Sequence, residues 1–155
     1  MNTVDETDLR HLRMAIELSR QAKAKGNGAY GAVLVGAGGE VLAEAENTQV
    51  TECDGTGHAE MNLVRKAGSV FDRATLADAT LYASAEPCAM CAGAIFWSGV
   101  KRVVYALGSE RNYALLPTSG DELRIGCREI LNRGGRGVEV AGPALEDEAE
   151  QVFRQ

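Results

Sequence analysis

The sequence predicts an α/β protein, a three-layer α/β/α sandwich whose five-stranded mixed sheet begins with an antiparallel hairpin and continues with parallel strands. Helix-like and strand-like segments alternate along the 155 residues in the order α-β-β-α-β-α-β-α-β-α. Only the first two strands follow each other directly, and the helical crossovers before the later strands favour parallel neighbours. Because no linker or internal repeat is visible at this length, we expect a single domain over residues 1–155.

The chain opens with an amphipathic helix, expected over residues 5–25, and Thr3 with Glu6 fits a capping box at its start. The next two segments, 30–35 and 40–46, are strand-like runs joined by the glycine-rich turn GAGG, and we expect them to pair antiparallel. The apolar face of the opening helix is marked by residues at helical spacing, namely Leu9, Leu12 and Ile16.

The rest of the chain alternates helices and strands. Glycine and proline mark several of the boundaries, with Gly68 closing one helix and Pro87 preceding another. The expected helices are 58–67, 88–97, 121–133 and about 145–153, and the expected strands are 80–84, 101–107 and 138–140.

Composition and charge argue for a soluble protein and against a nucleic-acid partner. Hydrophobic residues make up 45% and charged residues 25%, and no apolar run has membrane-spanning length. The acidic N-terminus lacks the pattern of a secretory signal, so we expect a cytoplasmic location and no membrane partner. A formal net charge of −6 disfavours nucleic acid, because phosphate backbones are bound by clustered Lys and Arg.

A glycine motif near the first strand resembles a nucleotide-binding fingerprint but lies in the wrong context. Gly26, Gly28 and Gly31 spell G-N-G-A-Y-G. The fingerprint requires glycines that follow a strand and open a helix, so that the helix N-terminus receives the pyrophosphate. Here they follow a helix and open a strand, which indicates a helix cap and a turn.

Two clusters of chemically active residues stand out. His58 and Glu60 open one predicted helix, and Cys88 and Cys91 open another. Cysteines three apart at a helix start lie on the same side and can bind one ion, while the first-turn N–H groups favour thiolate. Side chains two residues apart point to nearly opposite sides in the middle of a helix, so both reach one point only if the N-terminal end of the helix is directed at that point. We therefore expect His58 and Glu60 to lie at a helix N-terminus that is directed at the site.

This set is typical of a catalytic zinc site. One imidazole and two thiolates leave the fourth tetrahedral position open for water. The two thiolates cancel the formal charge of Zn²⁺, so the water needs a nearby base, which Glu60 supplies.

A C-x-x-C pair is also found in redox dithiols and structural zinc sites. A redox pair needs no partner histidine, and a structural site needs a fourth ligand, for which Cys53 is the only candidate nearby. The arrangement H-x-E…P-C-x-x-C, a deaminase signature, favours catalysis. Cys53 and Cys127 then fit ordinary thiols, and His11 fits a surface residue without a role.

At these residues the chain resembles the cytidine deaminase superfamily, and within it the branch of bacterial guanine deaminases, fungal cytosine deaminases and tRNA adenosine deaminases. The likeness runs from about Tyr30 to Leu107 and is closest in kind to bacterial guanine deaminases. It implies that the histidine and both cysteines bind one zinc ion per subunit. It also implies that the glutamate shuttles protons while water adds to the amidine carbon of an aminoazine ring and ammonia leaves.

The resemblance extends to substrate contacts and assembly. It implies that Asn47 hydrogen-bonds the bound base and that Ala59 contributes backbone contacts. The main-chain N–H of Cys88 and the carbonyl of Glu86 are expected to line the reacting centre. A homodimer is also expected from the family.

The substrate is less well defined than the reaction. A helix between the last two strands sets the chain apart from free-nucleoside deaminases, and its acidic C-terminus disfavours tRNA. We therefore expect a small free base: guanine, cytosine or an s-triazine analogue such as ammeline. The alternatives are a tRNA-specific adenosine deaminase and a non-enzymatic, zinc-stabilised binding module, and Glu60 argues against the module.

Four further side chains are candidate substrate contacts. Tyr30 and Trp97 could stack on a ring, although Phe96 and Trp97 fit a core or subunit interface better. Glu146 or Glu148 would contact ring N–H groups if the acidic tail closes over the pocket.

Overall fold

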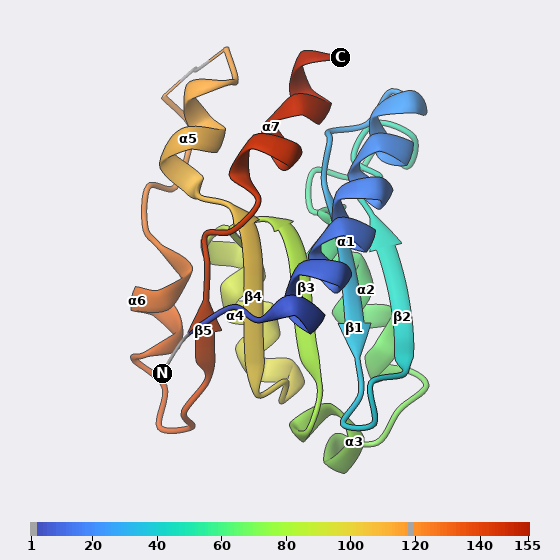
Figure 1. Cartoon of the computed structure of the whole chain (residues 1–155), viewed down its shortest axis with the longest axis vertical. Coiled ribbons are helices and arrows are strands. Elements are labelled where there is room, and N and C mark those ends of the chain that lie inside the picture. Colours follow the sequence, from blue (N-terminus) through green and yellow to red (C-terminus); the bar gives the residue numbers. More distant parts are fainter. Residues whose placement is uncertain (1–2, 118–119) are drawn as a thin grey trace.

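The computed structural model describes residues 3–117 and 120–155, and it confirms the predicted α/β/α architecture (Figure 1). The sheet has the strand order β2-β1-β3-β4-β5. β1 pairs antiparallel with both β2 and β3, whereas β3 with β4 and β4 with β5 are parallel. The strands are β1 (Gly31–Val35), β2 (Val41–Glu46), β3 (Thr80–Ala85), β4 (Arg102–Leu107) and β5 (Glu139–Ala141).

Helices cover both faces of the sheet. In Figure 1, α1 (Glu6–Ala24) and α7 (Glu146–Arg154) lie in front of the strands, and α2 (Ala59–Gly68) and α4 (Ala89–Ser98) lie behind them. None of the helices in the described ranges is long and apolar enough to cross a membrane. The shorter helices are α3 (Arg73–Ala77), α5 (Ser109–Ala114) and α6 (Cys127–Leu131).

The central strands are buried on both faces because each face packs against helices. Alternate side chains enter two separate cores, so that Val33 and Val104 face α1 and α7 while Leu34 and Val103 face α2 and α4. All four are fully buried. This explains why the strands read as continuous apolar runs, as two-sided burial requires.

The segment between β4 and β5 differs from the helix expected over 121–133. It forms α6 over five residues only, and α5, which the sequence did not predict, forms earlier in the same connection. α6 begins at Cys127 because Gly126 has extended backbone angles and the Cys127 N–H donates to Glu86 Oε2 at 2.9 Å. The parallel crossover itself is as expected.

The start of α1 requires two corrections. Its capping box is formed by Asp5 and Asp8, whose side chains accept from each other's backbone N–H at 2.8 and 3.0 Å, and not by Thr3 and Glu6. His11 is buried rather than on the surface, with its ring 4.9 Å from that of Tyr82. The face of α1 that contacts the sheet therefore includes polar positions, which apolar periodicity alone does not mark.

A buried ion pair ties α1 to the sheet. Asp8 accepts hydrogen bonds from Tyr82 Oη at 2.7 Å and from Arg102 Nη1 and Nη2 at 2.7 and 2.9 Å. Burial alone would raise the pKa of Asp8, but these hydrogen bonds and the Arg102 charge outweigh it and lower that pKa to about 2. The carboxylate is thus ionised in the folded protein at all ordinary pH values.

Replacing Asp8 by Asn is expected to lower the free energy of unfolding by about 3–5 kcal/mol at pH 7, because Arg102 loses its buried partner. The lowered pKa predicts that this advantage of the wild type is full above pH 4 and shrinks as the pH falls towards 2. Urea denaturation followed by circular dichroism at several pH values measures both effects. Glu17→Gln, which removes one partner of an exposed pair, is the control and should change stability by less than about 1 kcal/mol. An equal loss in both variants would contradict the prediction.

Candidate active site

The site lies at one edge of the sheet, where several chain segments meet. Asn47 follows β2, Glu86 follows β3 and Gly108 follows β4, while Tyr30 directly precedes the antiparallel β1. The Asn47 N–H donates to the Tyr30 carbonyl at 3.0 Å, which fixes two of these segments side by side. The carboxyl ends of parallel strands are the usual position of ligand sites in α/β sheets.

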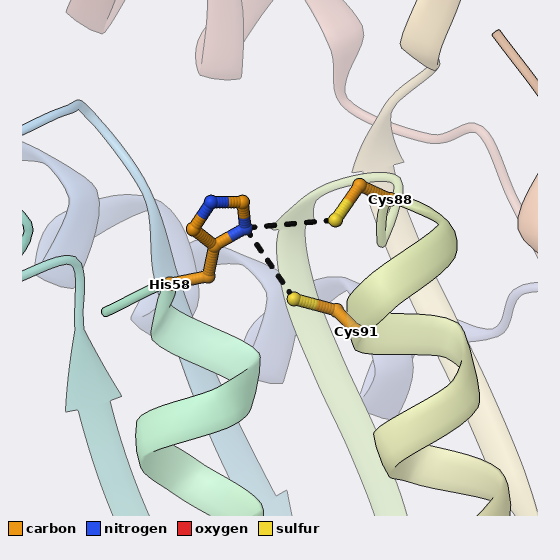
Figure 2. A group of neighbouring side chains, drawn as sticks. All are labelled: His58, Cys88 and Cys91. Atoms are coloured by element: carbon orange, nitrogen blue, oxygen red, sulfur yellow. Dashed lines mark hydrogen bonds between the residues drawn. The ribbon is translucent and has the colours of Figure 1, made fainter. Parts of the chain in front are cut away.

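The predicted metal ligands come together at two helix N-termini (Figure 2). His58 is the N-cap residue of α2 and Cys88 that of α4, and neither side chain makes a capping hydrogen bond. Cys91 lies one turn further along α4. His58 Nδ1 is 3.5 Å from the Sγ atoms of both cysteines. The three ligand atoms all lie within 4.8 Å of one another, so they could hold one metal ion.

The chemistry of the donors fits zinc. A hydrogen bond from Cys91 lowers the pKa of Cys88 to about 4 against the effect of burial, and His58 contributes to the lowering. The same interaction, together with burial, raises the pKa of Cys91. At neutral pH Cys88 is therefore a thiolate, and zinc binding requires Cys91 to release its proton as well. Two thiolates and an imidazole within reach of one point are a common donor set for tetrahedral zinc.

Glu60 lies at the start of α2 and is 6% exposed. Burial, and after it the negative charge of Cys88, raises the pKa of Glu60 to about 7. A carboxyl group with a pKa near neutrality can both accept and deliver a proton.

A cavity of about 530 Å³ opens above these residues. Asn47, a residue that is 1% exposed, lines it, and the backbone N–H of Gln49 orients the Asn47 side chain by donating to its Oδ1 at 3.0 Å. Tyr30 also lines it, and its hydroxyl donates to Asn112 Oδ1 at 3.2 Å. From the predicted set the lining contains Tyr30, Asn47, His58, Glu60, Glu86 and Cys88.

The remaining predicted contacts are not among the residues that line this cavity. Trp97 is 76% exposed and packs edge-on against Phe96. Glu146 accepts a hydrogen bond from the Gly108 N–H at 3.0 Å, and Glu148 pairs with Arg13 at 3.1 Å. Ala59 is fully buried at the first position of α2.

The two other cysteines are not part of the metal group found among the described residues. That group consists of His58, Cys88 and Cys91 alone. Cys53 is exposed, and Cys127 is buried at the start of α6. The three-ligand set fits an open catalytic site better than a closed structural one.

Sequence reasoning missed one wall of the cavity. This wall comes from the connection after β4, which carried no motif. Loop side chains of this kind are positioned by contacts distant in sequence, so no local pattern could have identified them. The residues that no sequence pattern indicated are Asn112, Leu116, Asp121, Glu122 and Leu123, and Tyr113 lies on the same wall.

Glu86 fixes that wall to the metal-binding turn. Its Oε1 accepts from the Ser109 N–H at 3.0 Å, and its Oε2 accepts from the Cys127 N–H at 2.9 Å. One carboxylate thus satisfies the first backbone donors of both α5 and α6. Because Pro87 and Cys88 follow directly, the connection that supplies the wall is bound next to a metal ligand.

A three-ligand zinc site beside a buried carboxylate, on an α/β/α sandwich, defines a zinc-dependent hydrolase. Comparison with known proteins narrows this class. Residues 5–107 match the model of the cytidine and deoxycytidylate deaminase zinc-binding region. This match spans more than half of the chain, which therefore belongs to this family of zinc-dependent deaminases, as the sequence motifs predicted.

Individual relatives have different substrates. A probable cytosine deaminase of Schizosaccharomyces pombe is 42% identical over 149 residues, covering 94% of this chain and 90% of that protein. A tRNA-specific adenosine deaminase of Haemophilus influenzae is 36% identical over 110 residues, covering 71% of this chain and 64% of that protein. The solved structure of a guanine deaminase from Nitrosomonas europaea superposes with a TM-score of 0.82 at 26% identity, covering 97% of this chain and 84% of that one.

Removal of a metal ligand tests the zinc site. We expect about one zinc per chain in the wild type and little in Cys91→Ser, because two remaining ligands hold zinc weakly. Cys53→Ser is the matched control and should keep its zinc. Metal content is measured by mass spectrometry after dialysis. If Cys53→Ser lost zinc as completely as Cys91→Ser, Cys53 would be a fourth ligand and the site structural.

The role of Glu86 predicts a local loss of order. Glu86→Gln offers a single carbonyl oxygen in place of two carboxylate oxygens, so the Ser109 and Cys127 N–H groups cannot both be satisfied as before. We expect faster hydrogen exchange over residues 108–117 and 120–127, with a stability loss of about 1.5–3 kcal/mol for the weakened charged hydrogen bond. Glu110→Gln, an exposed change on α5, should leave exchange unaltered. Unchanged exchange in Glu86→Gln would contradict this role.

Proposed function

We propose that the protein deaminates a small free aminoazine base, such as guanine, cytosine or an s-triazine analogue like ammeline, to the keto base and ammonia. The observation that carries this proposal is the cavity of about 530 Å³ that encloses Glu60 beside the His58–Cys88–Cys91 group. Such a cavity is in the size range of small-molecule sites.

The residues present support hydrolysis of a ring amine. A zinc ion at the three-ligand group supplies Lewis-acid chemistry, which makes water nucleophilic near neutral pH. Glu60 accepts a proton from the attacking water and delivers protons to the ring nitrogen and to the departing amine. A C–O bond forms at the amidine carbon, the C–N bond breaks, and the two hydrogens of water leave on ammonia and the product.

Asn47 is suited to hold the base. Its buried amide faces the cavity with an orientation set by Gln49. An amide offers both a donor and an acceptor, which matches the mixed edge of a nucleobase. Tyr30 adds an aromatic surface to the lining, held by Asn112 and by the edge of Phe153.

A tRNA adenosine deaminase is the second candidate, favoured by the match to the Haemophilus influenzae protein. The charge distribution opposes it. The chain has a formal net charge of −6, and Asp121 and Glu122 lie on the cavity wall, where an RNA strand would bring phosphates. A homodimer and a cytoplasmic location stay predictions from the family resemblance and the sequence.

Ammonia release from a panel of guanine, cytosine, adenine, triazines, nucleosides and tRNA tests the proposal. We expect turnover of one or more free bases, and a decrease in kcat of roughly 10²- to 10⁴-fold in Glu60→Gln, because that variant cannot carry the proton. Zinc content should be unchanged in this variant. Turnover of tRNA alone would favour the second candidate. Stoichiometric zinc with no turnover of any member would instead favour a zinc-stabilised binding module.

A further inference from the structure

We propose that Gly28 is a positioning residue that determines specificity, because the absence of a side chain there lets Tyr30 and Asn47 lie side by side at the base site. This inference rests on the proposed function, and it gives a role to a glycine that the sequence pattern explained only as part of a helix cap and a turn. Gly28 is not among the residues that line the cavity, whereas Tyr30 and Asn47 both line it. Gly28 therefore acts on the base through those two side chains.

The three glycines of the G-N-G-A-Y-G segment are present for different reasons. Gly26 has a φ of +89°, which a residue with a side chain adopts only with strain. A Cβ at Gly31 would lie 2.3 Å from the Ala15 carbonyl oxygen, so the close approach of α1 excludes a side chain there. Gly28 differs from both, because its φ is not positive and the atoms nearest to an added Cβ are side-chain atoms. Backbone geometry therefore does not explain the glycine at this position.

Those side-chain atoms belong to two residues of the cavity lining. A Cβ at Gly28 would lie 3.0 and 3.1 Å from Tyr30 Cδ2 and Cε2, and 3.4 Å from Asn47 Nδ2. The first two distances are shorter than the optimal separation of about 3.5–4.0 Å between carbon atoms. Gly28 thus leaves the space in which the phenol ring and the amide group lie against the backbone, and a methyl group there has to displace the ring.

Hydrogen bonds hold the backbone at Gly28 in place. The preceding residue, Asn27, is buried, and its Oδ1 accepts hydrogen bonds from the N–H groups of Val50 and Thr51 at 3.0 Å each. The Gly28 carbonyl accepts from the Tyr30 N–H at 2.8 Å. Because these bonds fix the segment to the loop that follows β2, the backbone cannot move away from an added methyl group without disturbing them.

The position of the Tyr30 ring affects the size of base that the cavity accepts. The Tyr30 hydroxyl donates to Asn112 Oδ1 at 3.2 Å, and the ring packs edge-on against Phe153 with 5.5 Å between the centroids. Because Gly28 lies outside the lining and Tyr30 within it, a displacement away from Gly28 moves the ring towards the bound base. A narrower site disfavours a two-ring base more than a one-ring base. Gly28 therefore keeps room for a two-ring base.

Gly28→Ala tests this role with the smallest change that adds a Cβ. On the free base of the panel with the highest kcat/KM, we expect kcat/KM to fall by about 5- to 30-fold, mostly through KM, because small displacements of groups that position a substrate are costly. Titration calorimetry into zinc-loaded Glu60→Gln measures the Kd of guanine and of cytosine. In that protein, Gly28→Ala should weaken guanine binding by at least about threefold more than cytosine binding.

A second variant separates this role from a general effect on the fold. Tyr30→Ala removes the ring atoms that the added Cβ would meet, so Gly28→Ala should change Kd by less than about twofold in that background. Gly68→Ala is the matched control, because Gly68 is exposed at the end of α2, and an added Cβ there meets nothing within 4 Å beyond its own helix in the described part of the chain. It should change kcat/KM by less than about twofold.

The outcomes distinguish this inference from the proposed function. A wild type that releases ammonia from no free base overturns both. If the wild type is active on a free base, unchanged KM and Kd in Gly28→Ala overturn the role of Gly28 alone. Equal losses for guanine and cytosine, or equal losses with and without the Tyr30 ring, do the same. A Gly28→Ala chain that does not fold, as judged by circular dichroism, also overturns it, because the fold and not the site then requires the glycine.

Discussion

The site depends on one geometric constraint: α2 and α4 begin at the same edge of the sheet, with their N-termini directed at one point (Figure 2). This constraint allows His58 and Cys88, which are N-cap residues, to contribute ligands without occupying the helix interior. It also places the backbone N–H of Cys91, in the first turn of α4, near the sulfur of Cys88, which favours the thiolate of Cys88. β2 and β3 both pair antiparallel with β1, so they run in the same direction and end at the same edge, where the segments that lead into α2 and α4 come close.

At the same edge, a single carboxylate holds the cavity wall that comes from the connection after β4. Glu86 accepts from the first backbone N–H groups of α5 and α6, two short helices that are too small to be stable alone. Arg111 adds a second attachment on the other side, where it pairs with Asp147 and Glu150 of α7. The wall is therefore held between the metal-binding turn and the C-terminal helix, and a change at either contact should alter the cavity without touching a metal ligand.

The sequence predicted the elements and the metal group well because both are local in the chain. The two cysteines, Cys88 and Cys91, are three residues apart, and His58 and Glu60 are two apart. Helix geometry determines from such spacings which way the side chains point, so the metal group could be predicted. Periodicity likewise revealed the long helices and the strands. It misplaced His11 and the cap of α1, because polar residues on a buried face break the pattern. The connection after β4 was read as one helix, since nothing local shows that Cys127 is bound by a carboxylate 41 residues away.

Two of the acidic groups that line the cavity, Glu60 and Glu122, lie in different surroundings. Glu60 is buried beside Cys88, so its charged form is disfavoured and it is suited to carry a proton. Glu122 lies on the wall that follows β4, with the Arg124 guanidinium 3.9 Å from its Oε2. A ligand with phosphate groups would bring further negative charge towards both, and the chain as a whole carries an acidic excess. Because carboxyl groups lie on more than one side of the cavity, additional negative charge on a ligand would be disfavoured there.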